Sequence, residues 1–179
     1  MNICVFCGSR SGNREIYTQQ ARELGYFMAA NGHGLVYGGG KVGIMGTIAD
    51  AVLEKGGKVY GMIPKSLKDL EVAHEGVTEL MVVGSMHERK KLMYDYSDAF
   101  IALPGGFGTL DEFCEILTWS QLGYHDKPIA FLNTEGYFDA LLQHFQYSVD
   151  EGFVPQELKD RILVGREIEE LVGRLTVNG

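Results

Sequence analysis

The sequence predicts an α/β protein built on a doubly wound, mostly parallel sheet of about six or seven strands flanked by helices. Short apolar runs alternate with amphipathic stretches from end to end, as βαβ units require. The runs are apolar on both faces, which is typical of strands covered by helices on both sides. Because the chain has 179 residues and shows no linker or repeat, we expect a single domain over residues 1–179.

The expected strands and helices follow in order along the chain. The strands cover residues 3–7, 35–37, 59–63, 80–83, 99–103, 129–132 and 162–164. The first helix has apolar residues at 17, 21, 24 and 28 and ends at Asn31 and Gly32. Its pattern recurs over residues 44–52, 110–117, 138–145 and 168–175, and another helix begins at Met86. Residues 64–76 lack the pattern, carry five charged side chains, and predict a mobile surface loop.

Charge and composition exclude several classes of function. The chain has 16 basic and 24 acidic residues, a net charge of −8, so we expect no nucleic-acid partner. No apolar run approaches the roughly 20 residues of a membrane span and no signal peptide is visible, so we expect no membrane partner and a cytoplasmic location. The histidines and cysteines show no metal-ligand spacing, and Cys4 and Cys7 lie on a strand where they point to opposite faces. We therefore expect neither a metal nor a cofactor.

Glycine is the most informative excess, with 24 residues, ten of which form three clusters that each follow an expected strand. The three clusters lie within residues 8–12, 38–46 and 105–108. In a parallel sheet every strand-to-helix turn lies at the carboxyl edge, where ligands bind. We therefore expect the three clusters to face one crevice, where the backbone can approach a ligand closely.

Residues 38–43, Gly-Gly-Gly-Lys-Val-Gly, satisfy the pattern G-x-G-x-x-G between a strand and a helix. A dinucleotide site also needs an acidic residue at the end of the next strand, and that strand ends in Met-Ile-Pro. A Walker A site needs Ser or Thr after the lysine, which valine follows here. A nucleotide-contacting turn or a packing turn remains, and we favour the first. The turn over residues 7–12 offers a second contact of the same kind.

The sharpest pattern is Leu-Pro-Gly-Gly-Phe-Gly-Thr-Leu-Asp-Glu at residues 103–112, where a strand ends and a helix is expected to begin near Thr109. The glycines that let the backbone approach a ligand are Gly105, Gly106 and Gly108. Free N–H groups and the helix dipole at such a start form an anion site. We interpret Asp111 as a complement to the dipole. Two carboxylates so close to the helix start would repel a bound anion, so we expect one of them, Glu112, to have a functional role in the site.

Residues 86–91, Met-His-Glu-Arg-Lys-Lys, open the helix after the fourth expected strand, on the same edge of the sheet. A solvated basic helix face is the plain alternative for such a run. Its position at the mouth of a glycine-lined crevice favours contact with a phosphate and a polar base. We expect Arg89 to act as a bidentate donor and Lys90 as a point charge.

Together these segments resemble the LONELY GUY family of cytokinin riboside monophosphate phosphoribohydrolases, long labelled lysine decarboxylase-like. The signatures M-H-x-R-K and P-G-G-x-G-T-x-x-E are complete, the segment Thr-Trp-Ser-Gln-Leu-Gly at 118–123 is also similar, and the similarity covers nearly the whole chain. The resemblance implies a Rossmann-like fold and a homodimer. The chain departs from the family at Arg10, where serine is common, and this adds a cation beside the expected phosphate.

The resemblance also implies the reaction: hydrolysis of the N-glycosidic bond of an N6-substituted adenosine 5′-monophosphate, which releases the base and ribose 5-phosphate. It places catalysis on Arg89 and Glu112. It places substrate contacts on Glu79, Lys90, Gly105, Gly106, Gly108, Thr109 and Thr118. The predicted topology, however, puts Glu79 at the start of the fourth strand, away from the crevice.

Two alternatives belong to other classes of protein. A nucleotide or molybdenum-cofactor carrier has a similar core and a related phosphate turn, but it binds without releasing a base and has no need of Arg89 and Glu112 as a pair. A pyridoxal-phosphate decarboxylase needs a Schiff-base lysine, and no lysine here is marked for that role. Within the nucleosidase hypothesis, AMP and prenylated AMP both stay open as the small-molecule substrate.

Overall fold

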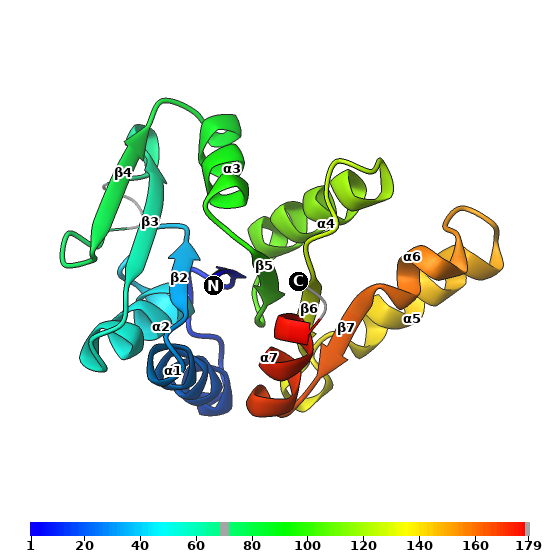
Figure 1. Cartoon of the computed structure of the whole chain (residues 1–179), viewed down its shortest axis with the longest axis horizontal. Coiled ribbons are helices and arrows are strands. Elements are labelled where there is room, and N and C mark those ends of the chain that lie inside the picture. The colour runs from blue at the N-terminus through cyan, green and yellow to red at the C-terminus, as the bar shows by residue number, and fades with distance from the viewer. Residues whose placement is uncertain (69–71, 178–179) are drawn as a thin grey trace.

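The computed structural model describes residues 1–68 and 72–177. Within these residues seven strands form one sheet in the order β4-β3-β2-β1-β5-β6-β7, with every neighbouring pair parallel (Figure 1). The strands are β1 (Asn2–Phe6), β2 (Gly34–Tyr37), β3 (Val59–Pro64), β4 (Glu79–Val83), β5 (Ala99–Ala102), β6 (Ile129–Leu132) and β7 (Ile162–Gly165). The predicted doubly wound α/β fold is confirmed, and each expected strand agrees with the observed one to within a residue at either end.

Seven α-helices connect and cover the strands in the described part of the chain. They are α1 (Glu15–Ala30), α2 (Gly43–Glu54), α3 (Met86–Asp95), α4 (Phe107–Gln121), α5 (Asp139–Asp150), α6 (Gln156–Asp160) and α7 (Ile168–Val177). Two short 3-10 turns, η1 (Lys65–Leu67) and η2 (Thr134–Gly136), complete the order. The sequence did not predict the five-residue α6. None of the described helices has the length and apolar character needed to cross a membrane.

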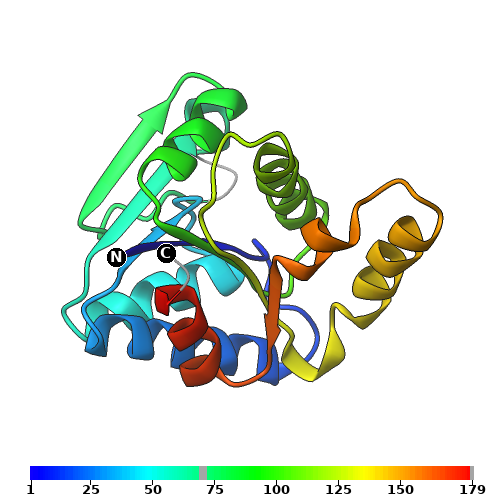
Figure 2. The ribbon, with the colours of Figure 1, turned by 45° about the vertical axis from the view of Figure 1, so that its right-hand side comes forward.

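The helices form a layer on each face of the sheet. Helices α1, α2 and α7 pack on one face and α3, α4 and α5 on the other; Figures 1 and 2 show α1 and α7 below the strands and α3 and α4 above them. Alternation along β1 divides the core between the layers, since Ile3 and Val5 pack with the first set and Cys4 and Phe6 with the second. Cys7 packs with Ile3 and Val5, so the two cysteines face opposite sides, as expected.

Residues 72–74 differ from the expected mobile loop, because two backbone hydrogen bonds of 2.9 Å tie them to the turn at 39–41. The side chain of His74 is buried, and its Nε2 lies 2.9 Å from Oδ1 of Asp50 in α2. Hydrogen bonding and burial therefore fix this part of the loop. Of the rest, residues 69–71 lie outside the described part of the chain.

The centre of the sheet positions the functional crevice. The chain winds outward from β1 to β4 and then returns to β5, which pairs with the opposite edge of β1 from Ile3↔Ala99 to Phe6↔Ala102. Two neighbouring parallel strands thus lead into connections that run to opposite sides, which is the topological switch point where α/β sheets bind ligands. The turns after β1 and β5 consequently leave the sheet side by side.

Candidate active site

A cavity of about 620 Å³ opens at this switch point, within the range usual for small-molecule sites. Its wall is formed by the turn after β1, by the starts of α2, α3 and α4, and by side chains of α1 and the segment that follows η2. The structure therefore brings the first and third glycine clusters to one crevice. The second cluster reaches it only at Ile44 and Met45.

Two glycine turns lie in direct contact at the floor of the cavity. Gly8 N–H donates to the Pro104 carbonyl at 3.2 Å, and the Tyr137 hydroxyl donates to the Gly105 carbonyl at 2.6 Å. A Cβ atom on Gly105 would lie 2.8 Å from the Gly8 nitrogen and would also strike Thr109 Oγ1. Glycine at position 105 thus allows the turns after β1 and β5 to pack against each other.

The start of α4 faces the cavity with free backbone N–H groups. The helix begins at Phe107 after the N-cap residue Gly106, two residues earlier than expected. The first N–H groups of any helix lack an intrahelical acceptor, and together with the helix dipole they favour an anion. Gly106, Gly108 and the buried Thr109 line this end of the cavity. The start of α4 therefore presents to the cavity the backbone donors that an anion site would use.

The earlier helix start corrects the expected position of the carboxylates. In α4, which is described throughout, the first turn contains no acidic residue. Asp111 and Glu112 lie in the second turn, and both line the cavity. Glu112 follows Gly108 by four residues, so it is on the same face of the helix, roughly 6 Å further along the axis. The backbone of Glu112 thus lies about one helical turn beyond the first N–H groups of α4.

Helix α3 begins with a capping box that the sequence analysis overlooked. Ser85 Oγ accepts a hydrogen bond from Glu88 N–H at 3.1 Å, and Glu88 Oε2 accepts one from Gly84 N–H at 2.7 Å. The pattern S-x-x-E at residues 85–88 is the signature from which it could have been predicted. This cap fixes the first turn of α3, which carries Arg89.

Arg89 is 4% exposed and lines the cavity. Its Nη2 donates to the Gly38 carbonyl at 3.0 Å, and Nη1 lies 3.9 Å from Met86 Sδ. A Cβ atom on Gly38 would strike the guanidinium. The turn at 38–43 was expected to contact a nucleotide. In the structure its Gly38 carbonyl accepts a hydrogen bond from the Arg89 guanidinium and so orients that side chain.

Arg89 and Glu112 act on a common neighbour, the buried thiol of Cys4. Burial raises the pKa of Cys4 well above its usual range, the Glu112 charge raises it further, and the Arg89 charge opposes this. Both side chains therefore lie within electrostatic reach of one point beneath the cavity. Arg89 of α3 and Glu112 of α4 thus bring a cation and a carboxylate to the wall of one cavity.

Three predicted substrate contacts do not line the cavity of the single chain. Lys90 Nζ lies 3.0 Å from Asp111 Oδ2 and 3.3 Å from Glu115 Oε2. Thr118 donates to the Cys114 carbonyl and lines a separate groove between α4, α5 and α6. Glu79 is the exposed first residue of β4, and the strand's other end, at the carboxyl edge, is roughly 13 Å away.

The sequence analysis also missed an aromatic wall of the cavity. Tyr17 and Tyr137 line it, with ring centroids 5.7 Å apart in an edge-to-face arrangement. Tyr17 carried only a helical-periodicity signal, and Tyr137 lies in an irregular segment without one. Ser9 and the exposed Arg10 line the cavity from the turn after β1, where a second phosphate contact was expected.

Among residues 1–68 and 72–177, no group of three or more His, Cys, Asp and Glu side chains is placed to hold a metal ion. The cavity instead offers backbone donors, a hydroxyl, a buried guanidinium and a carboxylate. Such a set can bind a phosphorylated ligand at the start of α4 and place a carboxylate beside its neighbouring group.

Comparison with known proteins shows close relatives. A family model described as "Possible lysine decarboxylase" matches residues 45–175. Cytokinin riboside 5'-monophosphate phosphoribohydrolase LOG1 of Arabidopsis thaliana is 48% identical over 173 residues, which cover 97% of this chain and 81% of LOG1. The probable enzyme of the same description from Oryza sativa subsp. japonica, LOGL1, is also 48% identical, with 97% and 78% covered.

Solved structures share the fold at much lower sequence identity. The molybdenum cofactor carrier protein MCP of Chlamydomonas reinhardtii superposes with a TM-score of 0.73 at 22% identity, covering 98% of this chain and 96% of its own. The molybdenum cofactor binding protein of Rippkaea orientalis gives 0.73 at 22%, with 98% and 95% covered. At this level of identity the likeness establishes the shared fold alone.

Proposed function

Because the chain belongs to the possible lysine decarboxylase family that includes the cytokinin riboside 5'-monophosphate phosphoribohydrolases, we propose that it is an N-glycosyl hydrolase of the same kind. Its substrates are AMP or N6-substituted adenosine 5′-monophosphates. The products are the free base and ribose 5-phosphate. The observation that carries the proposal is that Glu112, Arg89 and the start of α4 line one cavity.

The substrate phosphate binds at the start of α4. The N–H groups after Gly106 and the Thr109 hydroxyl supply the donors, and Arg10 adds positive charge at the cavity. Since the phosphate does not react, its binding energy orients the sugar and the base for the chemical step. A nucleoside without the phosphate is therefore a poor substrate.

Glu112 carries the chemical step. When the base leaves, the sugar carbon develops positive charge, as in glycoside hydrolysis. A carboxylate on the same helix as the phosphate-binding donors can stabilise that charge or activate the attacking water. Arg89, held by the Gly38 carbonyl, orients Glu112 and the nucleotide. A carrier protein needs no such pair, which is why we favour the hydrolase.

The test is chromatography of the products formed from AMP and from isopentenyladenosine monophosphate, each beside its nucleoside. We expect free base from the monophosphates alone. Glu112→Gln lowers kcat at least about 100-fold, since positioned acid–base groups contribute at least this much, which corresponds to about 2.7 kcal/mol. The matched control is Glu157→Gln, an exposed position on α6, and it leaves kcat unchanged. Tight nucleotide binding without base release would favour the carrier instead.

The proposal extends to a homodimer, which the family resemblance implies, and to a cytoplasmic location, which is expected from the sequence. Sedimentation equilibrium at micromolar concentration tests the assembly, and a monomer alone would contradict it. Cell fractionation with a tagged chain tests the location, and recovery with the membrane pellet would contradict it.

A further inference from the structure

The hydroxyl of Tyr137 reaches from the segment after η2 to the turn that precedes α4. It donates a hydrogen bond to the Gly105 carbonyl at 2.6 Å, and the side chain of Tyr137 lines the cavity. Building on the proposed function, we propose that Tyr137 is a positioning residue. Its hydroxyl fixes the orientation of the peptide group between Gly105 and Gly106, so that this group presents its N–H, and not its carbonyl oxygen, at the phosphate site.

The peptide group between Gly105 and Gly106 needs such a partner because glycine flanks it on both sides. A peptide group is planar, with its C=O and N–H pointing in opposite directions, so a rotation that reverses the group exchanges the two. That rotation takes the φ of Gly106 from −99° to about +80°, a region that glycine enters readily and other residues avoid. A Cβ atom on Gly106 would meet no atom within 4 Å, so the space beside its Cα is open.

The neighbouring carbonyls of the turn are held by the backbone. The carbonyls of Pro104 and Gly106 each accept a hydrogen bond from a backbone N–H at 3.2 Å. The Gly105 carbonyl accepts one from a side chain. A reversed peptide group would lose that bond, remove one backbone donor and place a carbonyl oxygen with partial negative charge beside the start of α4. The Tyr137 hydroxyl therefore favours the orientation that suits an anion.

The same hydrogen bond decides what the Tyr137 hydroxyl can offer a ligand. A tyrosine hydroxyl has a single proton, and here that proton is donated to the Gly105 carbonyl. The lone pairs that remain can only accept hydrogen bonds, as the oxygens of a phosphate dianion also do. Direct binding of a phosphate would therefore require the bond to Gly105 to break. A positioning role uses the observed contact as it stands.

The surrounding segment holds the Tyr137 ring in place before any ligand binds. The ring packs edge-to-face against Tyr17, with centroids 5.7 Å apart, and against Phe138 at 5.0 Å. Phe138 is buried and packs against Phe131 with ring centroids 4.3 Å apart. Its backbone N–H donates to Oδ1 of the buried Asn133 at 2.8 Å. Because the hydroxyl is already oriented, ligand binding does not bear the cost of ordering it.

Tyr137→Phe tests the proposal because it keeps the ring and removes the hydroxyl. We expect KM for AMP to rise about 3- to 10-fold, the effect of one neutral hydrogen bond, with kcat within about twofold. The dissociation constant of ribose 5-phosphate, measured by calorimetry, rises by the same factor. The inhibition constant of adenine, the product without a phosphate, stays within about twofold, because only phosphate binding is weakened. A rise in both constants would indicate general damage to the cavity and overturn the proposal.

Gly106→Ala distinguishes a positioning residue from a direct ligand. Alanine disfavours the φ of about +80° that the reversed peptide group requires, so the methyl group takes over the selection of the orientation. Whatever this change does to phosphate affinity by itself, adding Tyr137→Phe to it alters the dissociation constant of ribose 5-phosphate by less than about twofold. A loss of about 3- to 10-fold in both backgrounds would make Tyr137 a direct phosphate ligand and overturn the positioning role.

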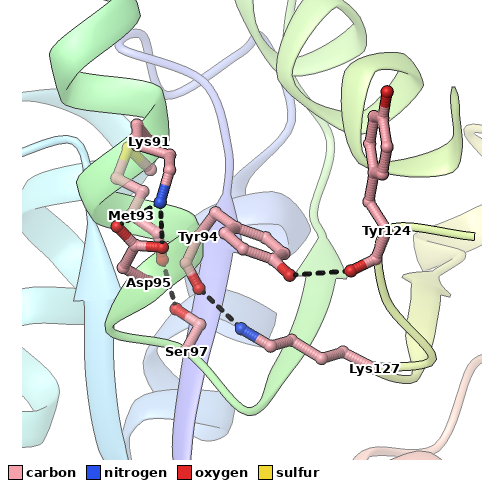
Figure 3. Close-up of polar contacts among 7 residues, drawn as sticks. All are labelled: Lys91, Met93, Tyr94, Asp95, Ser97, Tyr124 and Lys127. Carbon is pink, nitrogen blue, oxygen red and sulfur yellow. Dashed lines mark hydrogen bonds and ion pairs between the residues drawn. The ribbon is translucent and has the colours of Figure 1, made fainter. Parts of the chain in front are cut away.

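Two tyrosine hydroxyls outside the cavity provide matched controls. Figure 3 shows the Tyr94 hydroxyl directed at the Tyr124 carbonyl, at 3.5 Å, so Tyr94→Phe also removes a contact between a tyrosine hydroxyl and a backbone carbonyl. The Tyr26 hydroxyl donates to Glu54 at 2.6 Å, the same length as the bond to Gly105. Neither Tyr94 nor Tyr26 lines the cavity. We expect Tyr94→Phe and Tyr26→Phe to leave KM, kcat and the affinity for ribose 5-phosphate unchanged.

Failure of the positioning role and failure of the proposed function give different results. A wild-type chain that binds ribose 5-phosphate but releases no base refutes the hydrolase, and calorimetry still tests Tyr137. An active wild type whose affinity for ribose 5-phosphate survives Tyr137→Phe refutes only the positioning role. A wild type that does not bind ribose 5-phosphate refutes the phosphate site and the positioning role together.

Discussion

Gly108→Ala separates the stability of α4 from its use as an anion site. Gly108 is the second residue of α4, and a methyl group there meets no atom within 4 Å. Alanine at a compatible helical position stabilises a protein by about 0.4–1 kcal/mol, mainly by restricting the unfolded chain. For a chain of this size that raises Tm by roughly 1–4 °C. The same methyl group stands at the cavity wall where we propose that the phosphate binds, so we expect KM for AMP to rise at least about tenfold.

The assay pairs a thermal unfolding scan with AMP kinetics on the same preparations. Gly173→Ala in α7 is the control, because that position is exposed, helical and also free of atoms within 4 Å, but lies outside the cavity. It raises Tm similarly and leaves KM unchanged. A lower Tm for Gly108→Ala would refute the packing argument. An unchanged KM would refute the assignment of the helix start as the phosphate site.

Three further predictions concern the scaffold. Gly105→Ala destabilises the fold by about 1–3 kcal/mol, because its methyl group would lie 2.8 Å from the Gly8 nitrogen; a chemical denaturation midpoint equal to wild type would contradict this. His74→Ala costs about 1–3 kcal/mol in the same measurement, since it removes buried hydrogen bonds to Asp50 and Gly76, and an unchanged midpoint would contradict the proposed anchoring of residues 72–74. Burial lowers the pKa of His125 in the folded protein. As the pH falls, the unfolded chain therefore binds a proton at this histidine before the folded chain does. The contribution of His125 to the free energy of unfolding is complete above about pH 6.5 and is lost as the pH falls below that value. Tm measured from pH 7.5 to 5 should fall less in His125→Gln, and equal slopes would exclude His125 as the source.

The strands and most helices could be predicted because the spacing of apolar residues along each of them shows which side chains are buried. Apolar residues at 3–7 and 99–103 face helices on both sides of the sheet, and this requirement is visible in the sequence itself. The exact start of α4 was less accessible. Thr109 looked like the first helical residue, whereas the helix begins at Phe107 with Gly106 as its N-cap residue. That difference of two residues moves Glu112 from the first turn to the second.

Contacts between elements could not be predicted from spacing. Nothing near Lys90 in the sequence indicates that Asp111 and Glu115 will reach it, because the contact depends on how α3 packs beside α4. The role of the Gly38 carbonyl as the acceptor for Arg89 is hidden for the same reason, since the two residues are 51 positions apart in the chain. Tyr137 reaches the cavity from an irregular segment, where periodicity carries no information.

The position of β1 in the sheet couples ligand binding to folding order. Asn2 N–H is hydrogen-bonded to Asp98, 96 residues away, whereas β1 to β4 pair with neighbours much nearer in the chain. Closing so long a loop costs more entropy than the short-range pairings do, so we expect the β1–β5 pairing to form after β1 has paired with β2. The cavity exists only after that junction has closed. A nucleotide at 100 times its Kd would raise the free energy of unfolding by about 2.7 kcal/mol. Because the ligand contacts both halves of the sheet, its binding stabilises the β1–β5 pairing.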